Sequence, residues 1–442
     1  MLTAALTAID QTVDFRRFDN NGPDNVPNSA DDDGFVDFVA FVHPESGGEC
    51  DNGANGNIWS HRFALQSLTG SNFQTNDIGQ QGFNILIDDY VIMPAFACDG
   101  RTMIQIGVFS HEFGHAFGLP DLYDSQDPAE SAGIGGWGLM ASGSWGGDGL
   151  SNPASPSHMT AWSKEFLGWV SPRVIEADES GVRIEPVIGS GDVVRVDYSD
   201  EADPSDTRYL LLEYRTRDGF DSSLTSDGLL VTEINNTRVQ GGLPNNSVNG
   251  SPLDMGVNVI EADGDRDLDG NRNRADAGDV FPGRDNATSA DVSHAEGIRA
   301  ALCNIVQTPE HVTLDVFTSR TTCPGALAAA AVPPSEVAGG AVMRGEEVVV
   351  EGVLTNEGTN YFTDRRLVVT GEGTTGGKVV VTSPVPLETI APPSTAAGAG
   401  GAQDLSDILG KKVLIRGRLQ KEMQKGTGLT DVLVVEEFEV VE

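Results

Sequence analysis

Long apolar runs and basic side chains are both scarce in this chain of 442 residues. No apolar run approaches the roughly 20 residues that span a bilayer, so we expect no membrane span. Lysine and arginine number 28 against 66 aspartates and glutamates, which leaves a formal net charge of −38. Such a charge repels nucleic acid and anionic membrane surfaces, so neither is an expected partner. It suits cation binding, solubility at high salt, or both.

Cysteine is also scarce, with four residues in all: Cys50, Cys98, Cys303 and Cys323. None lies in a C-x-x-C pair, which argues against a zinc ribbon. Their spacing predicts two local disulfides, 50–98 and 303–323, with four buried free thiols as the alternative. Disulfides imply an oxidising compartment. No signal peptide is recognisable at the start, so we expect a processed or truncated chain, or an export signal further upstream.

The length predicts two to four domains, and composition places their boundaries. Residues 1–172 form the first predicted domain, in which residues 1–100 alternate short apolar runs with acidic loops. Residues 173–325 form the second and are β-rich with Gly/Asn/Asp connections. Residues 326–340 read as a linker of Ala, Val, Pro, Gly and Ser. Residues 341–442 hold five of the six lysines, about five β runs and a short helical stretch at Leu405–Leu409. We therefore expect an α+β chain that ends in a small β-barrel of the OB type, with an immunoglobulin-like sandwich as the competitor.

One helix is strongly predicted. Ile106, Phe109, Phe113 and Phe117 recur at spacings of three and four and build one apolar stripe. Thr102 with Gln105 resembles a capping box at the start, and Gly118 followed by Pro120 predicts the end. A second helix is predicted at 157–167, after a glycine-rich ordered loop. The predicted strands are 37–43, 84–88, 90–96, 193–198, 209–214 and 228–234.

The sequence His111-Glu112-Phe113-Gly114-His115 carries the chemistry. Four residues are just over one helical turn, so both imidazoles project from the same face. Two neutral imidazoles so placed can bind zinc, which lowers the pKa of a bound water to roughly 7. Glu112, beside them, is the predicted general base on that water and returns the proton to the leaving amine.

The third zinc ligand remains open from spacing alone. Gly118 can adopt positive φ and turn the chain back, which favours Asp121. His158 and then Asp148 are the alternatives. Asp121 would otherwise brace the loop or join Asp124 in a calcium site.

The segment from His111 to Asp124 resembles the immune inhibitor A family of secreted metallopeptidases, relatives of the metzincins. Flanking stretches carry the resemblance further over roughly residues 10–290; they are Trp59-Ser-His61, Gly133–Gly143, Ala161–Trp169, Glu261–Gly264 and Gly278–Gly283. The resemblance implies a metzincin-like catalytic domain and a secreted zinc endopeptidase that acts on proteins outside the cell. It also implies that Met140 forms an apolar floor under the histidines. His61 is expected to be a satisfied structural histidine.

Two acidic segments are predicted to bind structural calcium, because oxygen donors alternate around glycine turns. The donors expected in the first are Asp19, Asn21, Asp24, Asp31, Asp33 and Asp37. The second is similar to an EF-hand loop, with Asp265, Asp267, Asp269, Asn271, Asn273 and Asp276 at the ligand positions. A merely solvated, salt-adapted surface is the alternative for both.

The predicted partners are protein or peptide substrates, with Tyr90–Phe96 as one possible edge strand for an extended peptide. A competing hypothesis is a calcium-dependent adhesion module at the cell surface with a vestigial zinc site. The intact Glu112 argues against it, since a relic site has no need of a general base. Oligomeric state and cleavage preference are not encoded in any pattern that we can identify.

Overall fold

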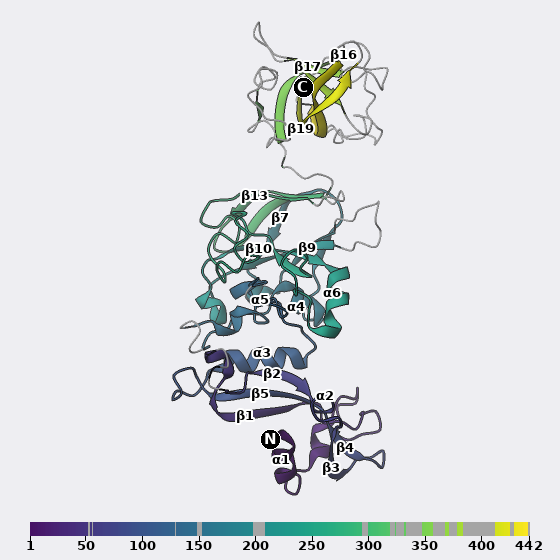
Figure 1. Cartoon of the computed structure of the whole chain (residues 1–442), viewed down its shortest axis with the longest axis vertical. Coiled ribbons are helices and arrows are strands. Elements are labelled where there is room, and N and C mark those ends of the chain that lie inside the picture. Colours follow the sequence, from purple (N-terminus) through teal and green to yellow (C-terminus); the bar gives the residue numbers. More distant parts are fainter. Residues whose placement is uncertain are drawn as a thin grey trace. The chain divides into compact units, whose positions relative to one another are not determined.

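The computed structural model describes residues 1–51, 54, 56–128, 130–147, 153–197, 208–293, 299–318 and 323, and the backbone of six strands beyond residue 330. Two compact units, Met1–Ser319 and Arg320–Glu442, make up the chain (Figure 1). Both helices and sheets occur, as the α+β prediction requires. Within the described ranges, no helix combines the length and apolar composition needed to cross a membrane.

The first unit begins with a small sheet between helices. Its strand order is β1-β5-β2, with β1 parallel and β2 antiparallel to β5. The elements of this region are α1 (Leu2–Ile9), η1 (Phe15–Phe18), β1 (Val39–Ser46), η2 (Gly48–Cys50), β2 (His61–Ala64), α2 (Leu65–Thr69), β3 (Phe73–Ile78), β4 (Asn84–Ile87) and β5 (Asp89–Phe96). Strands β3 and β4 form a separate hairpin. The strands predicted at 37–43, 84–88 and 90–96 are confirmed to within a few residues.

Strand β5 is buried on both faces because its side chains alternate between two cores. Tyr90 and Ile92 pack in the cluster that contains Leu6 of α1. Val91 and Met93 pack in a second cluster with Val108, a residue of the helix that carries His111. This explains its continuous apolar sequence, which is typical of a central strand. The prediction that this strand offers a free edge is therefore wrong, because β1 and β2 flank it.

The predicted helix is α3, Ile106–Ala116, and it lies beside the sheet (Figure 1). Gly118 has φ +93° and ends it as predicted. The capping box is wrong: Gln105 is the N-cap without a side-chain hydrogen bond, and the Thr102 hydroxyl donates instead to Asp99 at 2.6 Å. Asp99 is the better acceptor for Thr102 because its carboxylate also receives the backbone N–H of that residue.

The apolar stripe of α3 does not form its buried face. Ile106 and Phe117 are 48% and 57% exposed, whereas His111 and Glu112 are 9% and 4% exposed. Glycines on the buried side explain the inversion, because they let the neighbouring chain approach closely. A Cβ added at Gly114 would lie 2.4 Å from Met140 Sδ. The helix therefore turns its polar face inward.

A long ordered loop with two short turns, η3 (Gly135–Trp137) and η4 (Ser142–Trp145), follows α3. The helix predicted at 157–167 is shorter and is α4, Ala161–Phe166. Residues 157 and 158 precede this helix and bind other parts of the fold through their backbone N–H groups. Ser157 donates to the Gly143 carbonyl at 2.8 Å and His158 donates to Asp221 at 2.7 Å.

Two further sheets follow, with orders β11-β10-β9-β8-β6 and β12-β13-β14-β7. The five-stranded sheet packs against the loop, and the four-stranded sheet packs on its other face. Their strands are β6 (Arg173–Ile175), β7 (Glu179–Ile184), β8 (Val194–Asp197), β9 (Arg208–Arg215), β10 (Gly228–Asn235), β11 (Val257–Val259), β12 (Ala290–Ser293), β13 (Arg299–Gln307) and β14 (Val312–Phe317); the helices are α5 (Val187–Ser190), η5 (Gly219–Ser223), α6 (Asn236–Gly242) and η6 (Leu243–Asn245). The strands predicted at 193–198, 209–214 and 228–234 are confirmed as β8, β9 and β10.

The five-stranded sheet carries the core across the boundary predicted at residue 172. Leu210 and Leu212 of β9 pack between the two sheets. Leu211, on the opposite face, packs in one cluster with Trp137 and Trp162 of the motif-bearing region. Residues on both sides of position 172 therefore share one hydrophobic core within the first unit.

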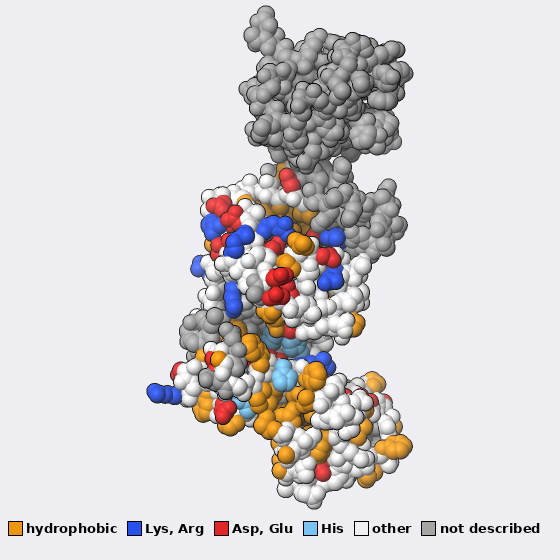
Figure 2. All heavy atoms as spheres, viewed as in Figure 1, with side chains coloured by type: hydrophobic (Ala, Val, Ile, Leu, Met, Phe, Trp, Pro, Cys, Tyr) orange, Lys and Arg blue, Asp and Glu red, His pale blue; other side chains and the backbone are white. Residues whose placement is uncertain are grey.

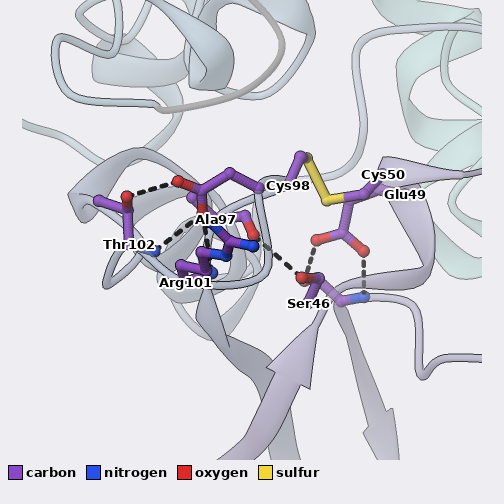
Figure 3. The surroundings of a disulfide bond; sticks show 9 residues. Ser46, Glu49, Cys50, Ala97, Cys98, Arg101 and Thr102 are labelled. Carbon is purple, nitrogen blue, oxygen red and sulfur yellow. Dashed lines mark hydrogen bonds between the residues drawn. A yellow bond between two sulfur atoms is a disulfide. The ribbon is translucent and has the colours of Figure 1, made fainter.

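The predicted disulfide between Cys50 and Cys98 is confirmed (Figure 3). It joins the turn after β1 to the end of β5. Beside it, the Ser46 hydroxyl donates to the Ala97 carbonyl at 2.9 Å, and Glu49 accepts from the Ser60 hydroxyl at 2.7 Å. Cys303 and Cys323 are likewise disulfide-bonded rather than free.

Apart from Cys323, the described part of the second unit is strand. It comprises β15 (Ala331–Val332), β16 (Glu347–Asn356), β17 (Leu367–Thr370), β18 (Lys378–Thr382), β19 (Lys412–Gln424) and β20 (Gly428–Val440). The order is β15-β16-β17-β18-β20-β19, and β16 pairs with β19 in addition. Strand β15 lies inside the predicted linker, and the helical stretch predicted at 405–409 lies outside the described residues. The OB-type assignment stays a prediction that these pairings favour.

Candidate metal centre

Helix α3 and the turn after it bring three metal-ligating side chains together. The His111 and His115 rings meet edge to face, with centroids 4.9 Å apart. Asp121 Oδ1 lies 3.1 Å from His111 Nε2 and 3.3 Å from His115 Nε2. The three ligand atoms all lie within 4.8 Å of one another, and all three residues are buried. Among the residues that the structure describes, no other group of three has this spacing.

Two backbone carbonyls orient the imidazoles. His111 Nδ1 lies 2.9 Å from the Leu139 oxygen, and His115 Nδ1 lies 2.8 Å from the Leu119 oxygen. A carbonyl only accepts, so each Nδ1 carries a proton and donates. In the neutral ring, Nε2 then presents its lone pair toward Asp121. This is the arrangement by which proteins prepare histidine to ligate metal.

Asp121 receives its own support from a distant segment. Asn246 Nδ2 donates to Asp121 Oδ2 at 2.6 Å, and the Asp121 backbone N–H donates to Asn246 Oδ1 at 2.7 Å. Asp121 Oδ1 is left buried without a well-formed hydrogen bond. When both rings are neutral, this anionic oxygen and two nitrogen lone pairs converge, which is unfavourable unless a cation or a proton lies among them.

The pKa values of the three residues express the same requirement. Burial lowers the pKa of His111, but the hydrogen bond and charge of Asp121 outweigh it and raise that pKa to about 9. Burial raises the pKa of the Asp121 carboxyl, but the hydrogen bonds and charges of the two histidines outweigh burial and hold that pKa well below its usual range. A proton on His111 therefore satisfies the site in the metal-free protein. The donor set of two imidazoles and one carboxylate fits zinc in its place.

Glu112 lies next to His111 in α3 and has one carboxylate oxygen free of hydrogen bonds. It is 4% exposed, and its Oε2 is buried without a hydrogen-bond partner. Burial raises the pKa of Glu112, the two histidines lower it, and Asp121 raises it further, with a net rise. A carboxylate with a raised pKa is suited to accept and return a proton near neutral pH.

Met140 and Tyr123 also pack around the centre. Met140 is 1% exposed and lies against α3 at Gly114, the position that the family resemblance implies. The Tyr123 ring lies nearly parallel to that of His111, with centroids 6.5 Å apart. Burial and the nearby Asp121 raise the pKa of Tyr123, so its hydroxyl stays protonated.

The other histidines and acids considered from the sequence lie elsewhere. His158 packs against Phe220, with ring centroids 6.4 Å apart, and does not join the group. His61 is a satisfied structural histidine, as predicted, because its ring nitrogens contact the Trp59 carbonyl and the Tyr90 hydroxyl. Asp124 braces the loop by accepting from two backbone N–H groups. Asp148 lies outside the described residues.

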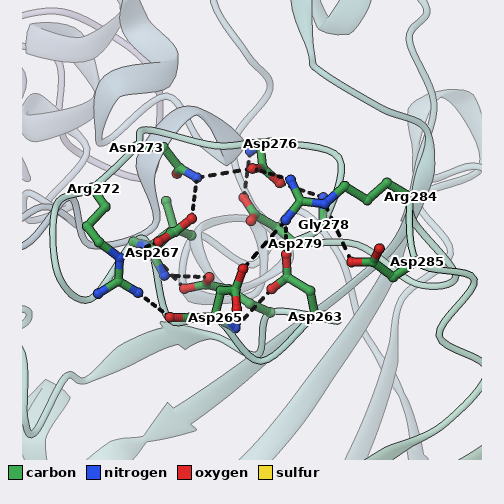
Figure 4. A network of polar contacts seen from close by, with 12 residues as sticks. Asp263, Asp265, Asp267, Arg272, Asn273, Asp276, Gly278, Asp279, Arg284 and Asp285 are labelled. Carbon is green, nitrogen blue, oxygen red and sulfur yellow. Dashed lines mark hydrogen bonds and ion pairs between the residues drawn. The ribbon is translucent and has the colours of Figure 1, made fainter.

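The EF-hand-like segment is neutralised by arginine. Arg284 donates to Asp276 at 2.8 Å and to Asp263 at 2.6 Å (Figure 4). Arg266 pairs with Asp269 and Arg272 pairs with Asp267. The predicted donors Asp265, Asp267, Asp269, Asn271, Asn273 and Asp276 form no metal-spaced group in the described residues. Because cationic side chains already compensate these carboxylates, the calcium prediction for this segment is not supported.

The first acidic segment differs in one respect. Most of its predicted donors are used within the loop: Asp24, Asp31, Asp33 and Asp37 accept from backbone N–H groups, and Asn21 accepts from Asp33 N. Asp19, by contrast, is 2% exposed, and its Oδ1 has no partner. Burial and the charges of Asp32, Asp33 and Asp37 raise the pKa of Asp19 to about 6.

Asn246 is the residue of this centre that sequence reasoning missed. It lies 125 residues from Asp121, in a stretch whose only local signal is a turn-type run of Asn and Ser. The carbonyls of Leu119 and Leu139 were also not identifiable, because every residue has one.

Two imidazoles and a carboxylate around one point, with a buried glutamate beside them, define the site class of a metal-dependent hydrolase. Residues 2–170 match the family described as immune inhibitor A peptidase M6, catalytic domain. This confirms the resemblance stated above for that part of the chain.

Three curated relatives agree with the family match. The chain is 35% identical over 156 residues to pre-pro-metalloprotease PrtV of two Vibrio cholerae serotype O1 strains, a match that covers 34% of this chain and 16% of PrtV. It is 29% identical over 188 residues to immune inhibitor A of Bacillus thuringiensis subsp. alesti, covering 40% of this chain and 26% of that protein. The chain thus spans about a quarter or less of the length of these relatives.

Proposed function

We propose that the chain is a zinc-dependent endopeptidase that acts on proteins outside the cell. One observation carries the proposal: two imidazole nitrogens and one carboxylate oxygen converge in a buried site, with the unpartnered Glu112 oxygen beside them. The family match and the metalloprotease named among the relatives support it. The disulfides support an oxidising, extracellular location.

His111, His115 and Asp121 would hold the metal. Bound zinc supplies Lewis acidity, polarising the scissile carbonyl and lowering the pKa of water. Glu112 accepts the proton of the attacking water at its free oxygen and then donates it to the leaving nitrogen. Leu139 and Leu119 keep the imidazoles in one tautomer, and Asn246 keeps Asp121 in place.

The surface around the centre suits an extended peptide. Strand β2, at the end of the β1-β5-β2 sheet, replaces β5 as the strand to which a substrate would add. Beside α3 lies a cavity of about 490 Å³, lined by apolar side chains that include Leu139, Met159 and Trp169. Figure 2 shows histidine side chains among hydrophobic ones on one face of the first unit. We infer that the cavity accepts an apolar side chain of the substrate.

Calcium enters the proposal at the first acidic segment alone. One buried oxygen of Asp19 has no hydrogen-bond partner, although the carboxylate accepts from the Gly34 backbone, and three further carboxylates lie near it, so a bound cation would stabilise this segment. The proposed role is structural, and Asp19 is the central ligand.

Digestion of a labelled unstructured protein such as casein tests the proposed function. Wild type should carry one zinc and cleave the substrate, and Glu112→Gln should retain zinc but lose activity by about 100-fold or more, the share of a general base. Glu176→Gln, an exposed acid distant in sequence from the motif, is the matched control and should cleave normally. Equal activity of Glu112→Gln and wild type would refute the mechanism. One bound zinc without proteolysis would favour the vestigial site of the adhesion hypothesis.

A further inference from the structure

Asn246 lies at a backbone position that few residue types adopt. It follows η6 with φ 51° and ψ 43°, the left-handed region that glycine and asparagine tolerate best. The segment around it is fastened to the loop after α3. The Ser125 hydroxyl donates to the Asn246 carbonyl, and Asn249 Nδ2 donates to the Leu122 carbonyl at 3.0 Å. Asn246 is therefore held in place independently of its own side chain.

The amide of Asn246 matches both polar groups of Asp121 that face it. Its nitrogen must point at the carboxylate, which only accepts, and its oxygen must point at the Asp121 N–H, which only donates. The orientation of the amide is thereby unambiguous. The amide occupies Oδ2 of Asp121 and leaves Oδ1 directed at the two histidine nitrogens.

We infer that Asn246 is a positioning residue for the metal centre, which rests on the proposed zinc function. It fixes the rotamer of Asp121 and stabilises its ionised form by a charge-assisted hydrogen bond. Among the described residues of 2–170, where the family match lies, Tyr123 is the other amide or hydroxyl side chain that hydrogen-bonds Asp121. The β-rich region after residue 172 thus completes the metal site rather than only adjoining it.

Two substitutions separate this role from a structural one. Asn246→Gly keeps the left-handed backbone without strain and removes the amide. Asn246→Asp keeps the shape but turns the donor to Asp121 into a second acceptor of like charge. The matched control is Asn286→Gly, because Asn286 is exposed and has nearly the same φ of 54°. All three variants should show the circular dichroism spectrum of the wild type.

The readout is the Kd for Zn²⁺, measured on the full chain by competition with a chromophoric chelator. Loss of a second-sphere partner of a metal ligand typically weakens affinity 10- to 100-fold. We expect that loss in Asn246→Gly, a larger loss in Asn246→Asp, and none in the control. A folded Asn246→Gly whose Kd lies within twofold of wild type would overturn the inference.

The measurement also separates this inference from the proposed function. Wild-type protein that binds zinc tightly without cleaving protein leaves the Kd comparison valid and refutes only the peptidase assignment. Unaltered zinc affinity in both Asn246 variants of an active peptidase refutes only the role of Asn246.

Discussion

Replacing Gly114 by alanine is expected to destabilise the first unit, although alanine is the better helix former. Gly114 lies in α3 between the two histidines, where an added Cβ would lie 2.4 Å from Met140 Sδ and 3.1 Å from Met140 Cε. Met140 is 1% exposed, so its side chain has no open space to enter. Alanine gains about 1 kcal/mol over glycine in a helix, and overpacking costs about 1–3 kcal/mol. We expect a net loss of up to about 2 kcal/mol, and reduced activity because the histidines shift with the helix.

A double-mutant cycle makes this prediction sharp. Met140→Ala alone should cost about 2–5 kcal/mol by leaving a cavity. In that background the methyl of Gly114→Ala enters the vacated space, so the same substitution should now stabilise. The coupling between the two sites should equal the relieved overpacking, about 1–3 kcal/mol, and is measured by urea denaturation. Gly241→Ala in α6, where an added Cβ meets nothing within 4 Å, is the control and should not destabilise. Equal effects of Gly114→Ala in both backgrounds would refute the packing of Met140 against α3.

Three further predictions concern charge. Asp279 is 1% exposed, and burial raises its pKa to about 6, although the hydrogen bond from Trp137 lowers it. The stability that its protonated form contributes is therefore present below about pH 4 and is lost as the pH rises through 6. Asp279→Asn should flatten this pH dependence, by up to about 3 kcal/mol in the free energy of unfolding between pH 4 and 7. In zinc-saturated protein, added calcium should raise the thermal midpoint, and Asp19→Asn should abolish that rise; a midpoint indifferent to added calcium would remove the calcium proposal. Arg215 is 0% exposed and lies 2.7 Å from Asp221, so Arg215→Met should lower the free energy of unfolding by about 3–5 kcal/mol because buried carboxylates lose their partner. Arg217→Met, in the exposed pair with Asp227, is the control and should lower it by under about 1 kcal/mol. Similar losses for both variants in chemical denaturation would contradict the assignment of the buried network.

The parts of the site that could be predicted are those that depend on residues close together in the sequence. The spacing of His111 and His115 depends only on the helical repeat, and the turn that presents Asp121 depends on the single glycine at 118. The strands of the central sheets were also predictable, because short apolar runs between turn residues seldom form anything else.

The rest depends on contacts that no local pattern encodes. Which face of α3 is buried is decided by what packs on it, and Met140 fits only against the glycine side. Asn246 reaches Asp121 across 125 residues, so no periodicity relates them. The EF-hand-like spacing of the carboxylates suggested a calcium site because the prediction did not consider the arginines within and after the loop. Arg266, Arg272 and Arg284 were visible in the sequence, but only the fold shows which carboxylates they bind.

A crystal of the full chain grown with zinc, with data collected on both sides of the zinc absorption edge, tests the central claim most directly. The account predicts one strong anomalous peak in the first unit, in contact with His111 Nε2, His115 Nε2 and Asp121 Oδ1 and within reach of Glu112. A zinc-bound protein whose peak lies elsewhere, or whose third ligand is His158 in place of Asp121, would contradict it.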